Sequence, residues 1–122
     1  MPTTFGIFDH IEGIPGTSTD RLLQDRLELV RLADETGFSA YHLAEHHGSD
    51  LCLAPNQELF VCAAAQVTER IRLGPMVKLL PLHHPVRILE DMCVADQLTG
   101  GRPIENEEAD QAYVFGGEHP AH

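Results

Sequence analysis

The chain has 122 residues, which by length indicates one domain, and 43% of them are hydrophobic, enough for an ordinary globular core. Its formal net charge of −11 argues against a nucleic-acid or anionic-membrane binder, because such proteins carry clustered basic residues. The N-terminus lacks a basic region followed by an apolar run, and no apolar stretch approaches the ~20 residues of a membrane span. We therefore expect a soluble, cytoplasmic protein.

The first predicted unit is a buried strand followed by an amphipathic helix. Residues 5–9 are apolar and aromatic, as in a short buried strand, and a loop rich in small and turn-forming residues follows. Asp20, or one of the two hydroxyl residues before it, opens the helix. Apolar residues then recur at spacings of three and four until Gly37, which is a typical helix terminator.

Two further units have the same order. Residues 39–44 form the second predicted strand, and Asn56 caps the helix that follows. A third apolar run covers residues 71–80, and Pro85 is well placed in the first turn of a third helix. The predicted inner face of that helix consists of Ile88, Leu89, Met92, Ala95 and Leu98.

Apolar strands that alternate with amphipathic helices predict an α/β fold with a parallel sheet. Parallel strands joined by crossover helices place their C-terminal ends on one edge of the sheet. Active sites lie at this edge in α/β barrels and in open α/β sheets. The residues that follow each predicted strand are therefore the first candidates for a functional site.

Histidines are concentrated at this edge. Five of the eight histidines follow a predicted strand: His10, His46, His47, His83 and His84. Histidine is suited to proton transfer near neutral pH, and a neighbouring carboxylate such as Glu45 can tune it. His84 has a simpler alternative role as a helix cap before Pro85. The clustering indicates a functional edge without naming a reaction.

Metal and thiol chemistry are less well supported. A site formed by His42, His46 and His47 is not expected, because one of them lies inside a strand and the other two are adjacent and point apart. Three cysteines without a CxxC pair suggest neither a zinc site nor a disulfide framework. We predict no metal site, and we interpret the cysteines as buried small hydrophobic residues.

Several motifs resemble the bacterial luciferase-like, flavin-dependent monooxygenases. Gly-Phe-Ser-Ala-Tyr-His-Leu-Ala-Glu-His-His, at 37–47, resembles the second strand of that family and the residues after it. Arg-Ile-Arg-Leu-Gly at 70–74 and Leu-Pro-Leu-His-His-Pro-Val-Arg at 80–87 resemble the third strand and its loop. Asp-Gln-Leu-Thr-Gly-Gly-Arg at 96–102 resembles the end of the third helix. The ordered set is specific and spans residues 5–102.

The resemblance implies a TIM-type (β/α)8 barrel that binds reduced FMN, or the deazaflavin F420 in some branches, at its C-terminal mouth. Such enzymes receive reduced flavin from a separate flavin reductase and use O2 to oxygenate a small organic substrate. By this resemblance the catalytic residue is His46, acting as a proton donor or hydrogen-bonding partner. The implied cofactor-binding residues are Glu45, Met76 and Val77, the last two at a peptide bond that is sometimes cis. The implied substrate-side residues are His10, His47 and His84.

The resemblance stops at residue 102. The family continues into a glycine-rich fourth strand that ends with an arginine for the flavin phosphate, whereas residues 103–122 contain five acids and no Lys or Arg. We therefore divide the chain into three βα units of a partial barrel, 1–102, and an irregular acidic tail, 103–122. We expect a truncated form whose third strand has an open edge, covered by a second copy or a partner chain.

Two other functions remain open. The chain could be a non-catalytic half-barrel subunit, or an inactive remnant of such an enzyme. It could also be a small metal- or ligand-binding α/β domain unrelated to flavin. The sequence does not identify the substrate.

Overall fold

A computed structural model describes residues 2–102, and every structural statement below refers to that part of the chain. The elements, in chain order, are β1 (Gly6–Asp9), α1 (Thr19–Thr36), β2 (Ala40–Leu43), α2 (Gln57–Ala65), β3 (Arg72–Pro75), a short 3-10 helix (Leu80–Leu82) and α3 (Pro85–Thr99). The predicted order of three strand–helix units is confirmed. The tail predicted over 103–122 lies outside the described residues.

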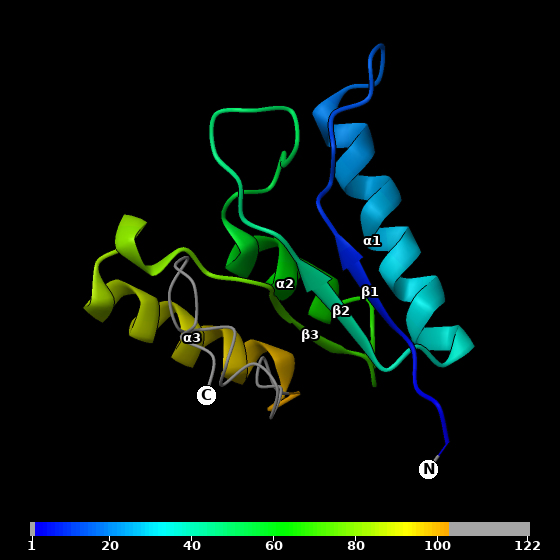
Figure 1. Ribbon diagram of the computed structural model, residues 1–122. Coiled ribbons are helices and arrows are strands. Elements are labelled where there is room, and N and C mark those ends of the chain that lie inside the picture. The colour runs from blue at the N-terminus through cyan, green and yellow to red at the C-terminus, as the bar shows by residue number, and fades with distance from the viewer. Residues whose placement is uncertain (1, 103–122) are drawn as a thin grey trace.

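The three strands form one parallel sheet in the order β1-β2-β3. Ile7 pairs with Tyr41, which pairs with Leu73, so these three side chains share one face of the sheet. All three strands run in the same direction, and their C-terminal ends therefore lie at one edge (Figure 1). The predicted α/β fold with a parallel sheet is confirmed.

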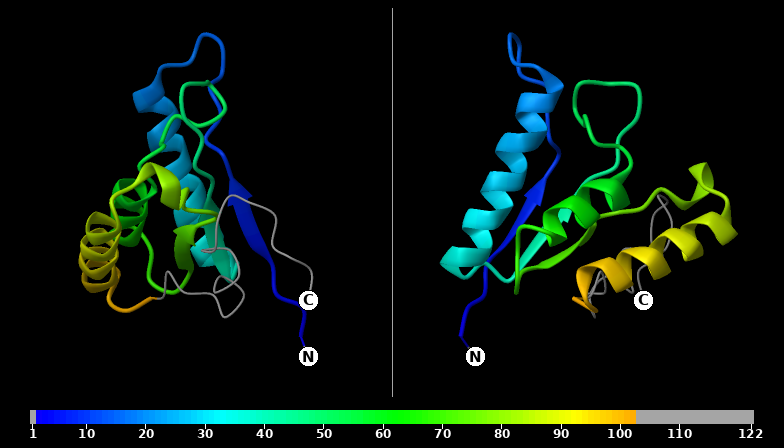
Figure 2. Two further views of the ribbon diagram at one scale, coloured as in Figure 1. Left: turned by 60° about the vertical axis from the view of Figure 1, so that its left-hand side comes forward. Right: turned by 180° about the vertical axis from the view of Figure 1, so that it is seen from behind.

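The hydrophobic core lies between the sheet and the first two helices. Seen from behind, α2 lies in front of the strands and α1 runs beside β1 (Figure 2). The largest buried core side chains include Tyr41, Leu43, Leu73 and Val61. Phe8 belongs to the opposite face and is 51% exposed. One face of the sheet is therefore covered by helices, and the other carries an exposed aromatic ring.

Glycines end two of the helices, as their sequence positions predict. Gly37 has a φ of 92°, and its N–H reaches back to carbonyl groups in the last turn of α1. Gly100 and Gly101 have φ values of 68° and 69° after α3. Glycine is favoured at these positions because a side chain disfavours the left-handed region. Helix α1 begins at Thr19, one residue before Asp20, which lies in its first turn.

A buried carboxylate joins the end of α1 to the start of β3. The side chain of Asp34 accepts hydrogen bonds from the backbone N–H groups of Glu69, Arg70 and Ile71, at 2.7, 3.0 and 2.7 Å. Burial raises the pKa of Asp34, but the three N–H groups and the charge on Arg70 outweigh it and leave the pKa below its ordinary value. Asp34 thus sets where the third strand begins.

Two details of the sequence prediction are wrong. Leu89 and Leu98, expected on the inner face of α3, are 64% and 52% exposed, whereas Ala95 is buried. The reason is that α3 packs on α2 along a narrow strip, and no other part of residues 2–102 covers its remaining apolar side chains. The cysteines were expected to be buried, and Cys52 is buried, but Cys93 is exposed.

No helix among the described residues is long and apolar enough to cross a membrane.

Candidate functional site at the strand ends

Two loops build the edge of the sheet where the strands end. The loop after β1 and the loop after β2 are joined by backbone hydrogen bonds from Gly13 N to Asp50 O, at 2.6 Å, and from Leu53 N to Ile11 O, at 3.0 Å. Buried Ile11 anchors this junction in the core. The residues that follow β1 and β2 are therefore held next to each other.

His10 and His46 meet at this edge. Their rings stack with centroids 5.4 Å apart and an interplanar angle of 18°, although they are separated by 36 positions in the sequence. Phe8 contacts the His10 ring edge-on, with centroids 4.8 Å apart. Both imidazoles are partly exposed, so solvent or a ligand can reach them. The structure thus brings together the predicted catalytic residue and one predicted substrate-side residue.

Asp9 holds the end of β1 immediately before His10. Its carboxylate accepts hydrogen bonds from the Tyr41 hydroxyl at 2.6 Å, from Arg26 Nε at 2.8 Å and from Ile11 N at 3.0 Å. Burial raises the pKa of Asp9, but the three hydrogen-bond donors and the charge on Arg26 together lower it by more. The pKa of Asp9 is therefore below its ordinary value. Burial, and after it the hydrogen bond to Asp9, raise the pKa of Tyr41. The ionised Asp9 carboxylate, held by three hydrogen bonds, fixes the backbone directly before His10.

Glu45 is the centre of a second cluster. Its side chain is completely buried, and Oε1 lies 2.7 Å from His47 Nε2 and 2.6 Å from His83 Nε2. Its other oxygen accepts a hydrogen bond from Leu79 N at 2.9 Å. Burial raises the pKa of Glu45, whereas the two histidines, the Leu79 N–H and the charge on Lys78 together bring it below its ordinary value. We call Glu45, His47 and His83 the Glu45 cluster.

His83 is one of the five histidines that follow predicted strands, but the family resemblance gave it no role. The 3-10 helix Leu80–Leu82 precedes it and turns its ring towards Glu45, while the neighbouring His84 becomes the N-cap of α3. The Nδ1 atom of His84 accepts from Val86 N at 3.3 Å, which supports the capping role considered for it. The adjacent pair His83-His84 was the available signal, but the sequence does not tell which ring turns inward.

The backbone after β3 is fixed by a buried glutamine. Gln57 Nε2 donates to the carbonyl oxygens of Leu43 and Val77, at 2.7 and 3.0 Å. Gln57 is completely buried and begins α2, so it ties the end of β2, the segment after β3 and a helix to one another. The Met76–Val77 peptide bond is cis. The predicted cofactor-binding residues therefore lie on a firmly held backbone.

The cations near the strand ends are already paired. Lys78 is buried, and its Nζ lies 2.6 Å from a carboxylate oxygen of Glu58. Arg26 is paired with Asp9 at 2.8 Å. Lys78 and Arg26 are therefore not free to bind an additional anion.

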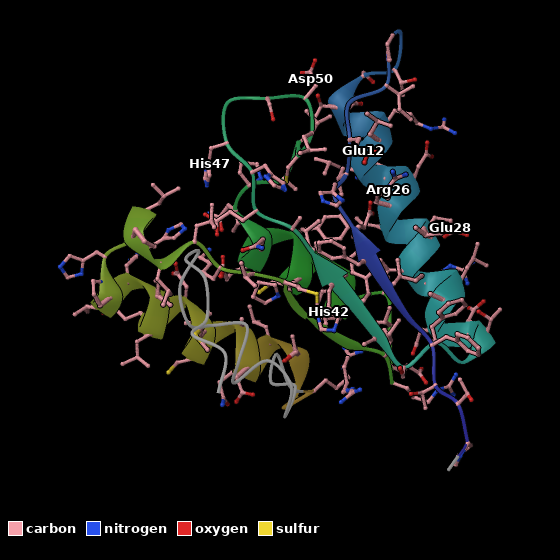
Figure 3. The ribbon with its side chains drawn as sticks, viewed as in Figure 1. Glu12, Arg26, Glu28, His42, His47 and Asp50 are labelled. Carbon is pink, nitrogen blue, oxygen red and sulfur yellow. The ribbon has the colours of Figure 1, made fainter. Side chains whose placement is uncertain are left out.

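His42 and His47 lie in separate places although the sequence puts them close together. His42 lies within the sheet, and His47 lies at the start of the loop that follows β2 (Figure 3). Burial, followed by the charge on Arg72, lowers the pKa of His42. The set of His42, His46 and His47 does not converge, which agrees with the reason for doubting a metal site there. A different histidine pair converges on Glu45.

Comparison with known proteins identifies the family. The profile of the luciferase-like monooxygenases matches residues 3–104. A protein of unassigned function from Sinorhizobium fredii is 49% identical over 80% of this chain and 28% of its own length. Limonene 1,2-monooxygenase of Rhodococcus erythropolis is 39% identical over 74% of this chain and 24% of its own length. The oxygenase component of the flavin-dependent trigonelline monooxygenase of Acinetobacter baylyi is 31% identical over 80% of this chain and 28% of its own length.

Solved structures show the same fold. The oxygenating constituent of 3,6-diketocamphane monooxygenase from Pseudomonas putida, solved with FMN, aligns with a TM-score of 0.78 at 24% identity, over 95% of this chain and 34% of that one. A coenzyme F420-dependent tetrahydromethanopterin reductase from Methanopyrus kandleri aligns with a TM-score of 0.61 at 22% identity, over 81% of this chain and 25% of that one. At these identities the alignments establish the fold alone.

The chain belongs to the luciferase-like monooxygenase family. It spans about a quarter of the length of the curated relatives that it matches. Its three parallel strands and helices match part of the TIM-type barrel of these monooxygenases. The resemblance seen in the sequence and the fold expected from it are both confirmed.

Proposed function

We propose that this chain forms part of a flavin-dependent monooxygenase that uses reduced FMN and O2 to oxygenate a small organic molecule. The observation that carries the proposal is the stacked pair His10–His46 at the C-terminal edge of β1 and β2, within a chain of this family. This edge is where α/β barrels bind their substrates and cofactors. The substrate class is left open, because the relatives act on chemically different molecules.

The face of the sheet that carries the exposed Phe8 ring is the proposed position for the planar ring of the cofactor. Phe8, His42 and Gly74 are paired in register across the three strands, and the Phe8 ring is exposed there. Gly74 has no side chain and is buried, so the Phe8 ring is the part of this register that a flat ring can reach. We assign the ring of the cofactor to this face, with Met76 and Val77 at its edge.

The flavin phosphate requires donors of its own. Because Arg26 and Lys78 are already paired with carboxylates, we infer that the phosphate binds to groups outside residues 2–102, in the same protein or in a second chain. A second chain would also cover the free edge of β3, which pairs with β2 on one side only among the described residues. A homo-oligomer or a partner chain is part of the proposal for this reason.

When bound, reduced flavin supplies the electrons and the site at which O2 is activated. His46 acts as the proton donor or hydrogen-bonding partner, because an imidazole can change its protonation state near neutral pH. His10, stacked on His46, orients that ring. Glu45 holds the loop after β2 and the segment before α3 in place through His47 and His83, and we assign His47 and His84 to the substrate side.

FMN is the proposed cofactor, since a structural relative was solved with FMN, whereas an F420-dependent relative shares the fold at a lower TM-score. A separate flavin reductase is the proposed source of reduced FMN. One relative is named as the oxygenase component of a flavin-dependent system, which supports this division of labour.

The first experiment is an anaerobic titration of the purified chain with reduced FMN, together with its molar mass in solution. Saturable micromolar binding by a defined oligomer would support the flavin proposal. Absence of binding by a stable oligomer would favour the alternative, a non-catalytic subunit. Absence of binding by an aggregated or loosely folded chain would favour an inactive remnant.

A further inference from the structure

The Glu45 cluster has the composition of a metal site. Glu45, His47 and His83 each offer one ligand atom, and the three atoms lie within 4.8 Å of one another. Two imidazole nitrogens and one carboxylate oxygen are the donor set that zinc and related first-row cations prefer over magnesium or calcium. We propose that the Glu45 cluster binds a divalent transition-metal cation, separately from the His10–His46 pair.

The geometry requires only small movements. Ligand atoms about 2.0–2.1 Å from a tetrahedral cation are about 3.3 Å apart. Glu45 Oε1 lies 2.7 Å from His47 Nε2 and 2.6 Å from His83 Nε2, so each pair opens by less than 1 Å to admit the ion. The cation replaces the hydrogen-bonding protons between Glu45 Oε1 and the Nε2 atoms of His47 and His83. Metal binding therefore needs a side-chain adjustment and no change of fold.

The surroundings hold the ligand atoms of the Glu45 cluster in a defined position. The Leu79 N–H holds the other Glu45 oxygen, which is the arrangement by which outer contacts orient a metal-binding carboxylate. A small cleft of about 220 Å³ lies against the cluster and is lined by Asn56, Asp91 and Lys78 beside the two histidines. The charge on Lys78 is balanced by Glu58, at 2.6 Å.

The cleft leaves room for a fourth ligand. The His47 side chain is 44% exposed, so an ion can enter from solvent, and water or a small anion can complete its coordination. The bound ion would fasten the loop after β2 to the segment before α3. It would thereby stiffen the strand-end edge on the side away from His10.

The test is isothermal titration of the chain with zinc chloride in the absence of flavin. One zinc ion per chain is expected for the wild type. The variants His83→Asn and His47→Asn should each weaken binding by more than about 100-fold, because loss of a direct ligand exceeds the 10–100-fold cost of losing an outer contact. His84→Asn is the matched control, since asparagine keeps the N-cap acceptor and the lost imidazole is one residue away. Its affinity should match the wild type.

Equal weakening in His83→Asn and His84→Asn, or no binding by the wild type, would overturn the proposal. A second measurement uses the wild type alone, in case a variant does not fold. Zinc should protect His47 and His83 from acylation by diethyl pyrocarbonate, detected by peptide mass spectrometry, while His84 continues to react. Equal modification of all three with and without zinc would also overturn the proposal. Neither measurement depends on flavin binding, so failure of one proposal leaves the other unaffected.

Discussion

Replacement of Asp34 by alanine should destabilise the fold strongly, because this carboxylate satisfies three backbone N–H groups at the start of β3. The bond to Ile71 N is buried, and those to Glu69 N and Arg70 N are partly buried. A hydrogen bond to a charged group contributes about 1.5–3 kcal/mol, and an unsatisfied buried donor costs a similar amount. Water can reach the two partly buried groups after the substitution but not the third.

The expected loss of unfolding free energy follows from these contacts. The buried Ile71 N–H accounts for about 2–3 kcal/mol, and the two rehydrated groups for about 0.5–1 kcal/mol each. Asp34→Ala should therefore cost about 3–5 kcal/mol, which is at the upper end for a single substitution. The matched control is Asp25→Ala on the same helix, where the side chain is 47% exposed and pairs with Arg21. Its loss should be at most about 0.5 kcal/mol.

The pH dependence has a defined sign. Because the pKa of Asp34 is lower in the folded state, its stabilisation is complete above its ordinary pKa of 3.8 and is lost as the pH falls through the folded-state pKa. Urea unfolding followed by far-UV circular dichroism at neutral pH, and at a series of acidic pH values, measures both effects. The reasoning is refuted if Asp34→Ala costs no more than Asp25→Ala, or if the variant keeps the full acid sensitivity of the wild type.

Three further outcomes are expected. His46→Ala should abolish oxygenation by the flavin-loaded protein while changing the unfolding free energy by less than about 1 kcal/mol, since the ring lies at the surface of the strand-end edge; loss of cooperative unfolding would instead make it structural. Gln57→Leu should cost about 1–3 kcal/mol in urea unfolding, because the partly buried Val77 carbonyl loses the Gln57 donor and the buried Leu43 carbonyl keeps only the Met76 N–H; an unchanged midpoint would contradict this. Arg102→Met should lower the thermal midpoint, because Arg102 donates to oxygen atoms at the ends of both α2 and α3; Arg87→Met, at a 73% exposed side chain, is its control.

Much of the architecture follows from local pattern in the sequence. The spacing of apolar residues, Gly37 and Pro85 marked most strands and helices close to their observed bounds. The third apolar run, 71–80, is the exception, because β3 ends at Pro75 and the run continues to the 3-10 helix that starts at Leu80. Alternation of strands and helices implied a parallel sheet, and a parallel sheet places the residues after each strand on one edge. For that reason the sequence predicts that His10 and His46 lie near each other, and their rings do stack.

Tertiary structure decided several contacts that no local pattern in the sequence predicts. Glu45 and His83 are 38 positions apart, and their contact depends on the 3-10 turn that directs one of two adjacent histidines inward. Asp34 looks like an ordinary helix residue until its carboxylate meets the N–H groups before β3. The exposed apolar side of α3 was likewise unpredictable, because periodicity shows which side chains share a face but not what covers it. Local preferences act over a few residues, whereas these contacts require the packing of distant segments against one another.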